Sequence, residues 1–217
     1  MKLYWPYLYS VSKEKNNEVK RILKTQKAAE NLFGTIYFTC ITALGFYVLR
    51  KTDYLPWMLG GKAENDMNNV WVNFPVVDDR EYAEELKIYF LVSYGYHLSS
   101  LFDLIKTNRE AQRSDFIEML LHHLLTCLLI LLAYMSNVIN FGSLILFIHD
   151  WADIPCSIVK IAIELEFEKP IWISAMANLF VWAWSRLFVF PQVIYFAQYI
   201  AFDEMVYPQA HVEGHID

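Results

Sequence analysis

The sequence has few charged residues and few cysteines. Only 19% of its 217 residues are charged, whereas 56% are hydrophobic and 17% are aromatic. Soluble domains average about 25% charged and about 45–50% apolar residues. A disordered chain is excluded, because disordered segments lack the apolar residues that a core needs. The three cysteines, Cys40, Cys127 and Cys156, all lie in apolar runs, so a disulfide scaffold is excluded as well.

Two further absences narrow the class of protein. The net charge is −6, so no basic surface argues for a nucleic-acid partner. The N-terminus lacks the short apolar region and small-residue cleavage site of a secretory signal, so we expect none to be removed. The apolar segments also leave too little polar surface to cover a protein that faces water on all sides. A membrane protein remains.

The apolar residues are gathered into segments long enough to cross a bilayer. A transmembrane helix needs roughly 20 predominantly apolar residues to cross about 30 Å of hydrocarbon. Five segments meet or approach this requirement: residues 31–49, 86–105, 116–135, 138–163 and 171–190. We therefore predict an all-α fold, a polytopic membrane helical bundle with about five transmembrane helices. Pro191 either kinks one long final helix or ends the last span.

The flanking segments set the domain limits and the orientation. We predict a charged N-terminal tail over residues 1–28, with a short interfacial amphipathic helix within 11–30. The membrane domain then covers residues 29–202, and a short polar tail covers 203–217. If all five segments cross, 11 Lys and Arg residues lie on the N-terminal side and 4 on the other. Positive charge concentrates in the cytosol, so we predict a cytosolic N-terminus.

Several polar and ionisable residues interrupt the apolar segments. An ionisable side chain at membrane depth is costly and indicates a functional site. The candidates are His97 in the second segment, His122, His123 and Thr126 in the third, His149, Asp150 and Asp153 in the fourth, and Arg186 in the fifth.

Helical geometry predicts which of these residues can meet. A helix rises 1.5 Å per residue, which gives each residue a depth below the membrane face that carries most Lys and Arg. The depth is about 9 Å for His122, about 10 Å for Asp153 and about 13 Å for His97, so the three lie nearly at one level. Arg186 lies about 22 Å from the start of the last segment at Ile171. This is too deep to meet His122, so we expect Arg186 to neutralise Asp150. His122 and His123 diverge by about 100° around the helix, so only one of them can point fully at a given partner.

A group of histidines and aspartates at one level suits acyl transfer. A carboxylate that accepts a hydrogen bond from one imidazole nitrogen leaves the other nitrogen free as base or nucleophile. A metal site is the competing chemistry, since His and Asp also bind iron and zinc. The five predicted segments contain one His-His pair and no HxxxH cluster, so we predict no metal. For any single histidine, the plainer interpretation is an interhelical hydrogen-bond partner.

Four stretches together resemble a known family. They are Arg113–Phe116, His122–Thr126, Leu146–Asp153 with its His-Asp-x-x-Asp pattern, and Ser185–Pro191. They resemble the Lag1 motif of ceramide synthases, within the TRAM–LAG1–CLN8 (TLC) domain family. The resemblance covers about residues 29–197 and implies a TLC-type helical barrel.

The resemblance also implies an activity and roles for the candidate residues. Ceramide synthases move a fatty acyl group from acyl-CoA to the amine of a sphingoid base, with an acyl-imidazole intermediate. His122, His123, Asp150 and Asp153 are then the catalytic candidates, and His97, Thr126, His149 and Arg186 support or bind substrate. No cofactor is implied beyond acyl-CoA, which is a substrate, and the endoplasmic reticulum is the expected membrane.

The match to the family also leaves alternatives open. The family's last barrel helix is expected to be missing, so another membrane chain, or a second copy, is expected to close the open seam. The alternative function is a catalytically idle TLC-fold accessory subunit of a larger membrane complex, for example a respiratory one in the mitochondrial inner membrane. A lipid-sensing TLC protein is the third possibility.

Overall fold

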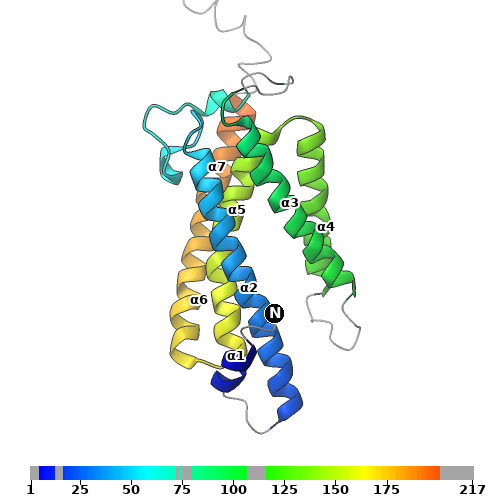
Figure 1. Ribbon diagram of the computed structural model, residues 1–217. Coiled ribbons are helices and arrows are strands. Elements are labelled where there is room, and N and C mark those ends of the chain that lie inside the picture. The colour runs from blue at the N-terminus through cyan, green and yellow to red at the C-terminus, as the bar shows by residue number, and fades with distance from the viewer. Residues whose placement is uncertain (1–4, 13–16, 72–73, 75–79, 107–115, 201–217) are drawn as a thin grey trace, which may run out of the picture. The chain divides into compact units, whose positions relative to one another are not determined.

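The computed structural model describes residues 5–12, 17–71, 74, 80–106 and 116–200, and every regular element among them is helical (Figure 1). The long helices are α2 (Glu18–Leu49), α3 (Ala83–Lys106), α4 (Phe116–Met135), α5 (Ile139–Glu164) and α6 (Glu168–Ala183). The shorter ones are α1 (Trp5–Val11), the 3₁₀ turns η1 (Trp57–Leu59) and η2 (Met67–Trp71), the π-helical segments η4 (Trp184–Val189) and η5 (Tyr195–Ile200), and α7 (Phe190–Ile194). An all-α membrane fold was the prediction, and it is confirmed.

Three helical stretches in the described part of the chain are long and apolar enough to cross a membrane: Glu18–Leu49, Phe116–Met135 and Glu168–Ala197. The second and fourth predicted spans also form helices, α3 and α5, of 24 and 26 residues. These two helices carry His97 and the pair Asp150 and Asp153, which lower their apolar character. A polytopic helical membrane protein is thus established, and the number of five crossings stays a prediction.

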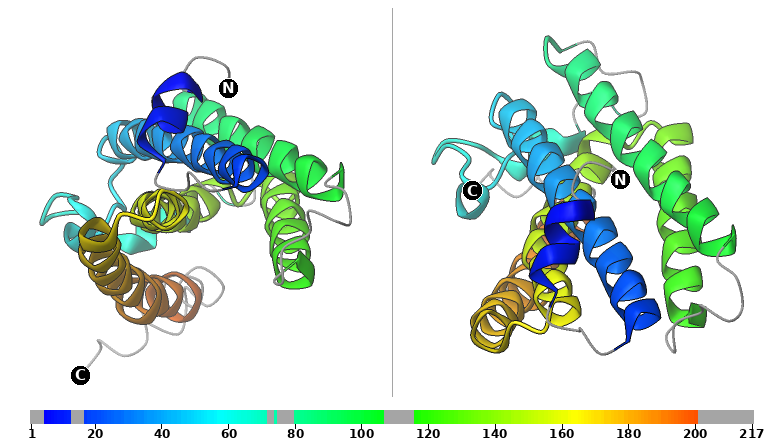
Figure 2. Two further views of the ribbon diagram at one scale, coloured as in Figure 1. Left: turned by 90° about the horizontal axis from the view of Figure 1, so that it is seen from below. Right: turned by 60° about the horizontal axis from the view of Figure 1, so that its bottom comes forward.

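The chain forms two compact units, which are described separately: residues 1–43 with 147–193, and residues 44–146 with 194–217. In the first unit, α1 packs against α2 and the end of α5 through a buried core of Leu8, Ala28, Ala29 and Leu165 (Figure 2). The Arg21 guanidinium lies 3.9 Å from the centre of the Tyr9 ring, and Lys24 forms an ion pair with Glu166. These contacts fix α1 to the N-terminal part of α2.

Helix α2 does not follow the predicted boundary between tail and membrane domain. Residues 18–30 are its first turns and not a separate short helix, because the helix runs without a break to Leu49. Its 32 residues correspond to about 48 Å, well beyond the roughly 30 Å of hydrocarbon. Residues 18–30 of the predicted interfacial region are therefore helical as the start of α2, and their place at the membrane interface stays a prediction. Residues 203–217 lie outside the described part of the chain.

Pro191 continues the last helix and does not end it. The helical run passes from α6 through η4, α7 and η5 without interruption. Proline lacks the N–H of the α-helical bond and crowds the preceding turn, and π-helical turns on both sides widen the helix around it. Of the two alternatives for Pro191, the single long helix is the one observed.

Helices α4 and α5 each end in a left-handed residue that is not glycine. At the end of α4, Asn137 has φ 57°, and the Val138 and Asn137 N–H groups donate to the carbonyls of Ala133 and Tyr134. This pair of bonds is the Schellman arrangement, which satisfies the last carbonyls of a helix. After α5, Glu166 has φ 58°, and the Phe167 and Glu166 N–H groups donate in the same way to the carbonyls of Ala162 and Ile163.

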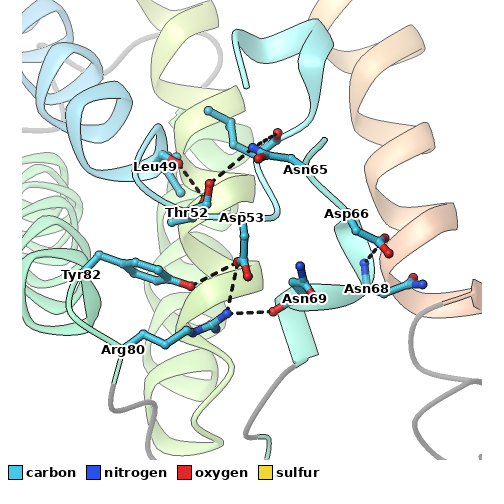
Figure 3. Close-up of polar contacts among 10 residues, drawn as sticks. Leu49, Thr52, Asp53, Asn65, Asp66, Asn68, Asn69, Arg80 and Tyr82 are labelled. Carbon is cyan, nitrogen blue, oxygen red and sulfur yellow. Dashed lines mark hydrogen bonds and ion pairs between the residues drawn. The ribbon is translucent and has the colours of Figure 1, made fainter. Parts of the chain in front are cut away.

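In the second unit, α3 packs against α4 over much of its length (Figure 1). The described residues of the loop between α2 and α3 make polar contacts with one another (Figure 3). Arg80 donates to the Asp53 carboxylate (3.3 Å) and to the Asn69 carbonyl (3.2 Å), and Tyr82 donates to the same carboxylate. Nearby, Lys51 pairs with Glu85 at 2.6 Å, and this carboxylate raises the pKa of the Lys51 ammonium. Charged pairs thus mark one polar end of this unit.

The same loop is also tied to the end of the last helix. The Trp71 indole N–H donates to the Ala197 carbonyl at 2.5 Å, and its ring lies 5.7 Å from that of Phe141. Close approach fixes the loop's path, since a Cβ on Gly61 would lie 1.8 Å from the Leu55 carbonyl oxygen. Only glycine fits at that position.

Candidate functional site

The His pair lies on α4 with its two rings in different surroundings. The buried side chains of α4 are Cys127 and Ile130, and His123 lies on the same face because it is four residues before Cys127. His123 is half-buried, whereas His122 is exposed, and their ring centres are 5.5 Å apart. The Thr126 hydroxyl donates to the His122 backbone carbonyl (2.8 Å), so it does not bond the imidazole. The two histidines are therefore not equivalent.

His97 brings a third imidazole to this pair. It lies on α3 with 7% of its surface exposed, and its ring centre is 6.5 Å from that of His123. The Tyr96 ring meets it edge-on at 5.8 Å. The sequence placed His97 and the His pair at similar depth, and within this unit the structure brings His97 beside His123.

The acidic candidates form a second cluster in the other unit. Asp150 on α5 is 1% exposed, and Asp153, one turn later, is half-buried. The half-buried guanidinium of Arg186 interacts electrostatically with both carboxylates. The sequence predicted that Arg186 neutralises Asp150, and the structure adds an interaction with Asp153. His149 packs edge-on against Phe190 at 5.3 Å.

Arg186 is carried by a π-helical turn. The segment η4 replaces the ordinary helix at residues 184–189, and the Phe190 N–H donates to the Ser185 carbonyl across five residues. Such turns occur frequently at functional sites, because the widened turn changes the direction in which side chains point. No residue pattern predicts this turn, apart from Pro191 just beyond it.

Each cluster is defined within its own unit, one imidazole-rich and one acidic. That the two act on a single substrate stays a prediction from the sequence. Among the buried polar residues that the sequence did not single out is Ser93, fully buried on α3. Its position four residues before His97 was the available signal, because residues at that spacing share a helix face.

Metal and thiol chemistry have no assembled site in the described residues. No group of three His, Cys, Asp or Glu side chains among them is placed to hold a metal ion. Cys40, Cys127 and Cys156 are free cysteines in three different helices.

Comparison with known proteins extends the resemblance to the whole domain. The family model for the TLC domain (TRAM, LAG1 and CLN8) matches residues 27–212. Among curated proteins, the chain is 29% identical to ceramide synthase hyl-2 of Caenorhabditis elegans over 168 residues, which are 77% of this chain and 47% of that protein. It is also 29% identical to sphingosine N-acyltransferase lag1 of Schizosaccharomyces pombe, over 76% of this chain and 38% of that protein. ASC1-like protein 3 of Oryza sativa matches at 27% identity, over 83% of this chain and 58% of the relative.

The chain thus spans about half the length of the curated relatives it matches. The matched region nevertheless includes most of α2, the whole of α3, α4, α5 and α6, and both polar clusters. This chain belongs to the TLC-domain family, defined by TRAM, LAG1 and CLN8.

Proposed function

We propose that the chain is a ceramide synthase-like N-acyltransferase, which moves a fatty acyl group from acyl-CoA to the amine of a sphingoid base. The observation that carries this proposal is the presence of the whole His-His and His-Asp-x-x-Asp pattern in a chain whose relatives are named ceramide synthase and sphingosine N-acyltransferase. The exposed ring of His122, beside the packed ring of His123, adds support.

The proposed reaction has two steps. In the first, an imidazole nitrogen of His122 attacks the thioester carbon, the carbon–sulfur bond breaks, and CoA leaves as the thiol after taking the proton that the acylated imidazole loses. In the second, the sphingoid amine attacks the acyl carbon, the carbon–imidazole bond breaks, and the amide forms as the amine nitrogen loses a proton, which the released imidazole takes up. Acyl-CoA and the sphingoid base are substrates, and we propose no further cofactor.

We assign the acidic cluster to charge control. Asp153 orients an imidazole or stabilises its protonated form, and Asp150 and His149 support it. Arg186 balances the two carboxylates at membrane depth, where isolated charges are costly. Thr126 holds the local helix backbone, since its hydroxyl is bonded to the His122 carbonyl.

The test is direct measurement of amide synthesis. The full chain is purified into lipid nanodiscs and given acyl-CoA and sphinganine, and N-acyl sphinganine is measured by mass spectrometry. We expect product from the wild type and at least about a hundredfold loss in His122→Ala and in Asp153→Ala, the size of a lost general base. His211→Ala and Asp103→Asn are matched controls, expected to retain activity.

Absence of product from well-folded wild type rejects the enzyme proposal. A stoichiometric complex in mild detergent, together with that absence, would favour the accessory subunit. The membrane we propose is the endoplasmic reticulum. The proposed partners are membrane lipid and another membrane chain or a second copy. Extraction and cross-linking measure the latter directly.

A further inference from the structure

Two polar side chains of α3 are buried one helical turn apart. Ser93 is 0% exposed and His97 is 7% exposed, and their spacing of four residues puts them on one face of the helix. Among the described residues, neither the Ser93 hydroxyl nor the Nδ1 of His97 has a hydrogen-bond partner. Buried polar atoms are nearly always satisfied, and exceptions point to an ordered water or a functional role.

The face of α3 that carries His97 lies beside α4 at His123. The His97 and His123 rings are 6.5 Å apart between centres and tilted by 46°. A direct hydrogen bond needs about 3 Å between the two nitrogens, which would bring the ring centres closer than observed. A separation of this size is suited to one bridging water. The second imidazole of the pair, His122, is exposed.

These surroundings suggest different tasks for the neighbouring histidines. An exposed ring can reach the thioester of a bound substrate, whereas a packed ring beside another imidazole can exchange protons. The second step of the proposed reaction releases one proton from the attacking amine. That proton must leave the reacting nitrogen before the amide is complete.

We propose that His97 is the proton-transfer partner of His123, acting through a water that Ser93 and His97 hold between α3 and α4. When the amine attacks the acyl group on His122, His123 takes the amine proton, and the water passes a proton on to His97. The proton then returns along the same path to the released imidazole of His122, which is thereby neutral and ready for the next cycle. His97 acts through His123 and is a positioning residue with respect to the substrate. This inference rests on the proposed function.

The plainer alternative is that His97 is a packing residue between α3 and α4. Histidines in membrane helices commonly serve as interhelical hydrogen-bond partners. A packing role predicts that its replacement loosens the helix pair and harms both reaction steps together. A proton-transfer role predicts loss in the second step alone.

The experiment separates the two steps in a single turnover. The full chain in nanodiscs is mixed with acyl-CoA, CoA release is followed as a burst, and sphinganine is then added to follow amide formation. His97→Gln keeps hydrogen-bonding ability but does not titrate. We expect its CoA burst to match the wild type and its amide step to slow at least about tenfold, toward the range of general acid–base catalysis.

Ser93→Ala removes a single hydroxyl and is the variant to use if His97→Gln does not fold. It should slow the same step by a smaller factor, with Ser99→Ala on the exposed side of α3 as the matched control. The inference is overturned if His97→Gln slows CoA release and amide formation equally. It is also overturned if His97→Gln and Ser93→Ala both form the amide at the wild-type rate. If the wild-type protein releases no CoA and forms no amide, the result contradicts the proposed function itself and not only this inference.

Discussion

At the scale of single residues, neighbours in the sequence have different surroundings. His122 and His123 are consecutive, and the sequence predicted that only one could face a given partner. The structure shows that His123 faces α3 and that His122 is exposed. Helical geometry predicts the divergence, but the choice between the two depends on which face of α4 packs against α3. That face is set by residues far along the chain, so the sequence pattern alone did not determine it.

A test of residue packing is available at Gly142. A Cβ there would lie 2.9 Å from the Phe90 ring and 3.3 Å from the Ala133 Cβ. The Phe90 ring is 1% exposed and stacks on Tyr134 at 6.5 Å, so it has little room to move. Overpacking lowers the free energy of unfolding by about 1–3 kcal/mol, whereas the higher helix propensity of alanine over glycine raises it by about 1 kcal/mol. Gly142→Ala should therefore lower the thermal midpoint in detergent.

Gly95 is the matched control for this change. It lies within α3, and a Cβ there would have no heavy atom within 4 Å. Only the helix-propensity gain applies, so Gly95→Ala should raise stability by up to about 1 kcal/mol. Equal shifts for the two variants, measured by differential scanning fluorimetry, would show that the contacts around Gly142 do not limit its size.

At the scale of elements, apolar runs predicted the helices better than their ends. The five predicted segments all became helices, because only helices satisfy backbone groups within so many apolar residues. The extension of α2 back to Glu18 was missed, since its charged first turns resemble a tail. The left-handed Asn137 is a common helix terminator, whereas Glu166 carries no such signal. The loop contacts of Figure 3 were also missed, because pairs such as Asp53 with Arg80 join distant positions.

The loop that follows α2 depends on the shape of Arg80 and not on its charge alone. Its guanidinium lies 5.0 Å from the centre of the Tyr82 ring and 5.8 Å from that of Tyr54, besides its bonds to Asp53 and Asn69. Lysine keeps the charge but loses the planar stacking and the forked donors. Arg80→Lys should lower the local opening free energy by about 1–2 kcal/mol.

Hydrogen exchange measures that opening directly. The Asp66 amide is a suitable reporter, because it donates to the Asp53 carbonyl at 2.9 Å. Its exchange should quicken in Arg80→Lys. The matched control is Lys62→Ala, since the Lys62–Glu64 pair is 3.9 Å apart and both side chains are largely exposed. Unchanged exchange at Asp66 in Arg80→Lys would mean that the stacking does not hold the loop.

At the scale of the whole molecule, charge and hydropathy give different information. The apolar segments predict five crossings, and the distribution of Lys and Arg then predicts a cytosolic N-terminus, whereas three helical stretches in the described residues are apolar enough to cross unaided. The remaining helices, α3 and α5, carry His97 and the two aspartates of the acidic cluster. Polar residues of this kind lower apparent hydropathy where a functional site lies within the membrane. The same residues that indicate the chemistry therefore obscure the topology.

The two topologies differ in the position of the segment between α3 and α4. If α3 crosses, residue 112 is cytosolic and residue 136 lies on the opposite side. If only the three apolar stretches cross, both positions are reversed.

In a variant whose native cysteines are replaced by alanine, Gln112→Cys and Ser136→Cys can be labelled in sealed microsomes with a membrane-impermeant maleimide. Arg109 and Arg113 flank position 112, and positive residues are retained in the cytosol. We therefore expect labelling at 112 from the outside of the vesicles and labelling at 136 only after the membrane is opened. The reverse pattern would place α3 and α5 outside the set of spanning helices.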